Sequence, residues 1–202
     1  MVRIDDNNDN FHDNTDYLQP KFVNCIFYNN RNNANHAKGG AVFADDSSPI
    51  FEQCVFDSNY ATGNGGAILI QADHATSKRT HIRSSTFKNN MVHLPSNTNT
   101  NDNWNTGSIS QPYAARLKLT NSEINNAGGN CDSKQTYGET GNTAGTFACP
   151  AVHIYMGSAT LWNNTIVDTT ADGIRVTGGI VDVRNNTVTA GEYAARVSSY
   201  NT

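Results

Sequence analysis

The chain has 202 residues and a formal net charge of −4, with only 16% charged residues. That charge argues against nucleic acid as the main partner, and we find no signal peptide and no apolar run near the ~18 residues that a membrane helix needs. The polarity comes mostly from Asn, Thr, Ser and Gly, a composition that suits short strands joined by many turns.

A six-residue unit recurs along the chain. Its copies are FVNCIF (22–27), FEQCVF (51–56), IRSSTF (82–87), LTNSEI (119–124), LWNNTI (161–166) and VRNNTV (183–188). The first and sixth positions are always large and apolar, and two inward positions five residues apart break the alternation of a strand. We therefore expect a bend at the third position, where Asn is common and accepts left-handed backbone at low cost.

A second short strand is predicted after most units, at GGAVF (39–43), GGAIL (65–69), PAVHI (150–154), DGIRV (172–176) and YAARV (193–197). For the third unit, the strand is either GSIS (107–110) or YAARL (113–117). Spacing favours GSIS, because Leu117 and Leu119 leave no room for a turn between YAARL and the fourth unit.

The steps between units are 29, 31, 37, 42 and 22 residues, which indicates a common core and one loop of variable length. A coil whose turns stack on one another gives this pattern, so we predict a single all-β domain over 1–202, a parallel β-helix (solenoid) of about six rungs. Phe27, Phe56 and Phe87 should then form an inward aromatic stack. Cys25 and Cys54 should be stacked neighbours, close enough to bridge but interpreted as buried free thiols.

The repeats also resemble known families. GGAV and GGAI, with FYNN, FDSN and FKNN, are similar to the GGA[ILV] and FxxN repeats of polymorphic outer-membrane proteins and related bacterial surface proteins. NNTI and NNTV resemble the right-handed β-helix repeat of the pectin-lyase-like superfamily. The resemblance covers most of 20–202, although GGA and FxxN fade after residue 90. It implies a right-handed coil, and such repeats serve adhesins, surface fibres and polysaccharide-degrading enzymes alike.

Two long loops, 91–106 and 127–150, are predicted to leave the same corner of adjacent rungs. They either form a groove that carries function or are tolerated surface insertions. Cys131 and Cys149 flank the second loop, which looks like an insertion closed by a disulfide, a pairing that favours an oxidising location. Trp104 in the first loop could stack on a sugar ring.

A basic column is predicted on the outward side of the second strands, at the position shared by Val42, Ile68, His153, Arg175 and Arg196. Like charges on neighbouring strands are unfavourable without a counter-charge. One solution is an anionic ligand such as a uronic acid chain. The other is local pairing with Asp172, Asp182 or Glu192.

Trp162 and Arg184 share a second outward column, which fits either sugar contact or cation–π packing. The sequons at 163–165 and 185–187 are interpreted as bend asparagines that form a ladder, rather than as glycan acceptors. No carboxylate cluster clearly marks a calcium site, and Asp45, Asp46 and Asp73 are only weak candidates because turns often carry Asp for backbone reasons.

These observations favour an extracellular or cell-surface module, or a fibre-forming one, that supports adhesion, assembly or glycan contact rather than catalysis. The alternative is a polysaccharide lyase, in which Arg175 and Arg196 would neutralise the uronic carboxylate and His153 or Tyr155 would remove the α-proton. The expected partners are polysaccharide and the neighbouring rungs. The chain is expected to be a segment of a longer protein or, failing that, a unit whose copies stack end to end.

Overall fold

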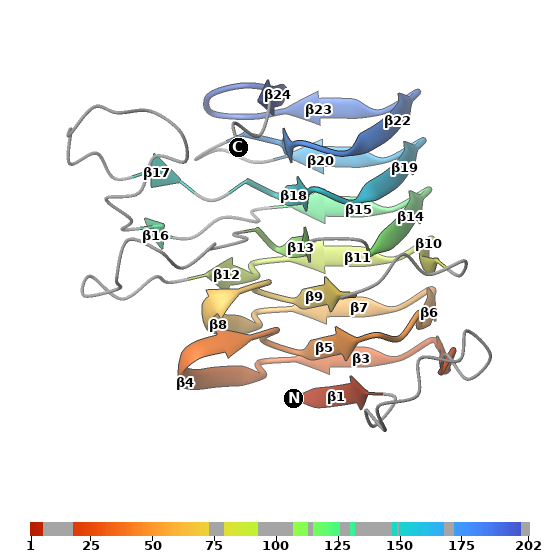
Figure 1. The fold of residues 1–202 in the computed structure, drawn as a ribbon, viewed down its shortest axis with the longest axis vertical. Helices are drawn as coiled ribbons and strands as arrows, with labels where there is room; N and C mark the ends of the chain where they lie inside the picture. Colours follow the sequence, from red (N-terminus) through yellow and green to blue (C-terminus); the bar gives the residue numbers. More distant parts are fainter. Residues whose placement is uncertain are drawn as a thin grey trace.

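The computed structural model describes residues 1–5, 18–72, 79–92, 107–112, 115–125, 130–131, 147–148, 150–167 and 172–198. These residues form 24 β-strands and no helix, and nearly all strands are stacked in parallel tiers from the N-terminus to the C-terminus (Figure 1). Consequently, no helix in the described part of the chain is long and apolar enough to cross a membrane.

Three parallel sheets and one shorter sheet contain the tiers. Sheet 1 comprises β1 (Val2–Asp5), β5 (Val42–Asp45), β9 (Ile68–Gln71), β13 (Ile109–Pro112), β18 (Val152–Tyr155), β21 (Ile174–Thr177) and β24 (Ala195–Ser198). Sheet 2 comprises β2 (Lys21–Val23), β6 (Ile50–Glu52), β10 (Thr80–Arg83), β14 (Arg116–Thr120), β19 (Ser158–Trp162) and β22 (Ile180–Arg184). Sheet 3 comprises β3 (Ile26–Tyr28), β7 (Val55–Asp57), β11 (Thr86–Lys88), β15 (Glu123–Asn125), β20 (Thr165–Val167) and β23 (Thr187–Thr189). Sheet 4 comprises β4 (Arg31–Lys38), β8 (Tyr60–Asn64) and β12 (Met91–Val92). A separate antiparallel pair joins β16 (Asn130–Cys131) to β17 (Phe147–Ala148).

The chain visits the sheets in a repeating order, from sheet 2 to sheet 3 and then through sheet 1 back to sheet 2. Each strand pairs in parallel with the strand from the next pass, so equivalent residues of the six units lie side by side. This arrangement is compatible with a parallel β-helix or solenoid. The strand predicted at GSIS is confirmed as β13, which pairs with β9 and β18.

The predicted bend is confirmed at the third position of all six units. The residues there have φ between 50° and 55° and are Asn24, Gln53, Ser84, Asn121, Asn163 and Asn185. This left-handed backbone turns the chain from sheet 2 into sheet 3 within one unit. The first and sixth residues of the unit can therefore both face the interior.

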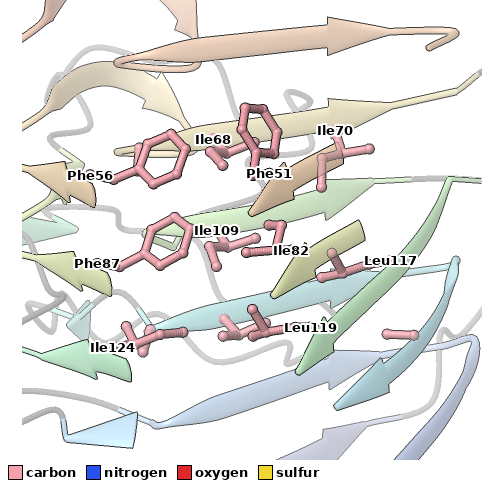
Figure 2. Packing of buried hydrophobic residues seen from close by; sticks show 14 of the residues in the cluster. Phe51, Phe56, Ile68, Ile70, Ile82, Phe87, Ile109, Leu117, Leu119 and Ile124 are labelled. Carbon is pink, nitrogen blue, oxygen red and sulfur yellow. The ribbon is translucent and has the colours of Figure 1, made fainter. Parts of the chain in front are cut away.

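The interior is a continuous apolar column between the sheets. Phe56 is fully buried and stacks on Phe27 and on Phe87, with ring centroids 4.6 Å apart in both pairs and interplanar angles of 3° and 5°. Figure 2 shows Phe56 and Phe87 one above the other, with Ile68 and Ile109 beside them. The predicted aromatic stack is thus confirmed.

Two ladders of polar side chains connect the rungs at the turns. In the first, Asn30 donates to Asn59, and Asn59 donates to Asn90. The second ladder lies at the fourth position of the unit, where each backbone N–H donates to the next residue of the series Cys54, Ser85, Ser122, Asn164 and Asn186. Of each sequon, the middle Asn therefore lies in this ladder and the first Asn makes the bend.

Cys25 and Cys54 occupy the fourth position in the first two rungs, and both are free thiols. Cys54 is buried, and burial raises the pKa of its thiol, whereas Cys25 is only half-buried. Cys149 lies outside the described residues, so the predicted bridge from Cys131 stays a prediction.

Candidate functional site

The predicted basic column exists as a register, since His153 aligns with Arg175 and Arg175 with Arg196. Its earlier members were wrongly assigned. Val42 and Ile68 align with Val152 and are fully buried in the core. Matching GGAVF with PAVHI position by position places Val42 beside His153, one residue away from its partner in the structure, Val152. A one-residue shift exchanges the two faces of a strand.

His153 points away from the apolar interior but is only 4% exposed. The positions that align with it in earlier rungs, Ser110 and Leu69, are both fully buried as well. Tyr155 is 2% exposed, and the His153 Nε2 atom lies 3.4 Å from the Thr177 Oγ1 atom. The outer side of sheet 1 is therefore not an open basic surface at this point.

Arg175 and Arg196 are neutralised by nearby carboxylates. Asp172 is fully buried, and its Oδ2 atom lies 2.7 Å from Arg175 Nη2 and 3.3 Å from Arg196 Nε. Arg196 also pairs with Glu192 at 2.9 Å. One buried carboxylate thus joins arginines from two rungs, which agrees with the local-pairing interpretation of this column.

A second group of cations lies on the outer side of sheet 2. We name it the basic face; it consists of Arg79, His81, Arg83, Arg116, Lys118 and Arg184. His81 and Arg83 in β10, and Arg116 and Lys118 in β14, alternate with buried inward residues, so their side chains lie on the outer side. The described outer positions of sheet 2 and its flanks carry six Lys and Arg side chains, namely Lys21 and the five of the basic face. Only two carboxylates, Glu52 and Asp182, lie on the same side, although the whole chain has a net charge of −4.

The two carboxylates on this side already have partners. Glu52 pairs with Arg83 at 2.7 Å and with Lys21 at 2.9 Å, and these contacts hold the pKa of its carboxyl below the ordinary value. Asp182 pairs with Arg184 at 2.8 Å. The prediction that Asp182 neutralises the 175/196 column was therefore wrong, because it lies on a different sheet.

Arg79 and Lys118 have no carboxylate partner among the described residues. The Arg79 side chain extends along the sheet until its Nη1 atom lies 3.4 Å from Thr160 Oγ1. His81 lies among these cations. Its pKa is lowered first by burial and then by the charges of Lys118, Arg79 and Arg83. A positive potential of this kind favours an anion in contact with the surface.

Two cations of the basic face lie over the ring of Trp162. Its predicted column with Arg184 is confirmed, with the Arg184 Cζ atom 5.1 Å from the ring centroid. Lys118 Nζ lies 5.5 Å from the same ring, so cation–π packing occurs on this side. Beside it runs a groove of about 390 Å³, whose lining includes Arg79, Thr160 and Trp162.

The remaining predicted site residues do not converge. Asp46 makes a bend with φ 44°, next to Asp45 at the end of β5. Asp73, Trp104 and most of both long loops lie outside the described residues. In the part of the chain that the structure describes, no group of three or more His, Cys, Asp or Glu side chains could hold a metal ion.

Comparisons with known proteins gave no match to a family model, to a curated protein or to a solved structure.

Proposed function

We propose that the chain is a right-handed parallel β-helix that acts as an extracellular or cell-surface module and binds an anionic polysaccharide through the basic face. The coil supplies a rigid, repetitive surface. The cations of β10 and β14 lie one strand spacing apart on it, about 4.8 Å, and Arg184 follows two strands further on. An extended polysaccharide lying along the axis presents its acidic groups to successive rungs.

A single observation carries this proposal. Arg79 lines a groove on a net acidic protein, Lys118 lies over Trp162 of the same lining, and neither cation has a carboxylate partner among the described residues. A carboxylate or sulfate of the ligand would supply the missing counter-charge and relieve the repulsion around His81. Trp162 supports the proposal because it holds Lys118 and Arg184 in place before the ligand arrives.

The lyase alternative has less support from this geometry. Arg175 and Arg196 are paired with Asp172 and Glu192, and His153 and Tyr155 are almost fully buried. A base and an unpaired cation do not meet in a groove among these residues. We therefore retain binding, and not elimination, as the proposed activity.

The test is calorimetric titration with polygalacturonate, with neutral dextran as the uncharged comparison. Binding to polygalacturonate should weaken as salt is added, and dextran should not bind. Arg79→Gln and Lys118→Gln should each lower the affinity about tenfold to a hundredfold, since a hydrogen bond to a charged group is worth about 1.5 to 3 kcal/mol and every 1.4 kcal/mol is a factor of ten.

The matched control is Lys88→Gln. It removes one cation from β11 of sheet 3, where Lys88 pairs with Asp57 at 3.3 Å. The control should keep the wild-type affinity. Equal losses in all three variants would mean that only net charge matters, and the absence of binding to any charged polymer would overturn the proposal.

A further inference from the structure

Cys25 and Cys54 lie side by side in neighbouring rungs of the coil. The residues that follow them, Ile26 and Val55, are paired in register, and the Val55 N–H donates to the Cys25 carbonyl at 2.9 Å. Neighbouring strands are about 4.8 Å apart, and the Cα atoms of a disulfide are about 4.4 to 6.8 Å apart. The backbone therefore places the two cysteines at a separation that a disulfide can bridge.

The two side chains point in the same direction. Cys25 Sγ lies 3.4 Å from the Val23 carbonyl oxygen, and Cys54 Sγ lies 3.5 Å from the Glu52 carbonyl oxygen, in both cases two residues earlier in the chain. Cys54 Sγ also lies 3.5 Å from the Phe22 carbonyl oxygen, which belongs to the rung of Cys25. The sulfur of Cys54 therefore lies between the two rungs, on the side where Cys25 is.

The two thiols also influence each other. The pKa of the Cys54 thiol is raised first by burial, and the Cys25 thiol adds to the rise through its charge and through a hydrogen bond between the two side chains. The sulfur atoms are thus within reach of each other while both are still thiols.

Packing alone does not account for cysteine at these two positions. They are the fourth position of the repeating unit, where the backbone N–H of each rung donates to a polar side chain of the next, namely Ser85, Ser122, Asn164 and Asn186. Sulfur is a weak hydrogen-bond acceptor, so this connection is weaker between the rungs of Cys25 and Cys54. A covalent bond between the two sulfurs would more than replace it.

We propose that Cys25 and Cys54 are a redox-active pair, which closes to a disulfide in an oxidising medium and reopens in a reducing one. The bond encloses β3, β4, β5 and β6, which make up one complete turn of the coil. The proposal goes beyond polysaccharide binding. It needs no free end of the coil, because both sulfurs belong to neighbouring rungs of one chain.

The oxidant is a small disulfide such as oxidised glutathione. One cysteine thiolate attacks a sulfur of this disulfide, forms a mixed disulfide and releases one small thiolate. The thiolate of the second cysteine then attacks the protein sulfur of the mixed disulfide, and the second small thiolate leaves. The two cysteines lose two protons and two electrons, and the small disulfide is reduced to two thiols. Because burial raises the pKa of Cys54, the exchange should be faster in the folding chain than in the folded coil.

The experiment refolds the full chain from urea in a series of glutathione buffers, from fully reduced to fully oxidised. Cys131→Ser and Cys149→Ser are present throughout, so that only Cys25 and Cys54 can react. Acid quenching, alkylation of the remaining thiols and digestion with trypsin identify the bonded peptides by mass spectrometry. A crosslink between the peptides of Cys25 and Cys54 should appear as the buffer becomes oxidising, and it should be lost on refolding in a reducing buffer.

Thermal melting measures the consequence for the coil. The oxidised form should melt about 5 to 15 °C above the reduced form, because the bond closes a loop of about 30 residues and so restricts the unfolded chain. The matched control is Cys54→Ser, which introduces the residue found at the same position of the next two rungs, Ser85 and Ser122. It should fold, form no crosslink and melt at the same temperature in every buffer.

Three results of the mapping would overturn the proposal: two free thiols in the most oxidising buffer, a glutathione held on one of the cysteines, or a bond between two chains. A melting temperature that depends on the buffer no more than that of Cys54→Ser would overturn it as well.

Discussion

Replacing Asn59 with Ala tests whether the buried asparagine ladder holds the rungs together. Asn59 is fully buried, and its Nδ2 group donates to the Phe27 carbonyl at 2.9 Å and to Asn90 Oδ1 at 2.8 Å. Its Oδ1 atom accepts from the Asn30 backbone N–H at 3.0 Å and from Asn30 Nδ2 at 2.9 Å. The substitution removes all four hydrogen bonds, and two of the partners, the Phe27 carbonyl and Asn90 Oδ1, lie in the buried part of the ladder.

Four hydrogen bonds at a net ~1 kcal/mol each predict a loss of about 4 kcal/mol in the free energy of unfolding. Asn186 provides a matched control, because it makes the same kinds of bond in the last rung but is only half-buried. Water can replace its partners there, so Asn186→Ala should cost about 1 to 2 kcal/mol.

Urea denaturation followed by circular dichroism measures both variants against the wild-type chain. The expected order is a large loss for Asn59→Ala and a small one for Asn186→Ala, with similar m-values. If the two substitutions cost the same, or if Asn59→Ala costs less than about 1 kcal/mol, burial does not make the hydrogen bonds of the ladder more valuable. The reasoning then fails.

Three further outcomes are expected. Gln53 is exposed and has φ 54°, a left-handed conformation that strains a residue with a Cβ atom. Gln53→Gly should therefore raise the thermal midpoint by an amount worth about 0.5 to 1 kcal/mol. A lower midpoint would contradict this strain argument. Asp172→Asn removes the buried counter-charge of Arg175 and Arg196, and should lower the free energy of unfolding by about 3 kcal/mol in urea titrations; a loss below about 1 kcal/mol would show that solvent screens the arginines. His81 has a lowered pKa, first through burial and then through nearby cations, so the unfolded chain binds its proton more readily. Stability should therefore fall as pH drops below the ordinary value of 6.5. Binding of an anion should raise the pKa of His81 in NMR titrations, so the affinity for the anion should increase as the pH falls. His81→Gln should remove this pH dependence of the affinity.

Much of the fold could be predicted because its repeat consists of residue types with strong preferences for a backbone conformation or for burial. Large apolar residues five apart, as in Phe22 and Phe27, require a bend between them, and Asn24 fits the left-handed backbone there. Since every rung repeats this unit, the stacking of Phe27 on Phe56 followed from the constant offset alone.

The candidate site was harder to predict. Alternation along PAVHI shows that His153 points away from Ile154, but it contains no information about whether other chain covers that side, and His153 is buried. The basic face was missed for another reason. Its signal lies in THIR (80–83) and RLKLT (116–120), which alternate cations with core residues, and charges become a surface only when rungs are compared position by position.

The in-register stacking also bears on how such a molecule could lengthen during evolution. Asn59 and Asn90 are hydrogen-bonded equivalents 31 residues apart, so a duplication of residues 55–85 inserts one complete rung and preserves the register on both sides. Unequal recombination within the gene would therefore change the length of the coil in whole steps. Each added copy carries Arg79, His81 and Arg83, so every such event would extend the row of cations available to one long ligand and raise its avidity.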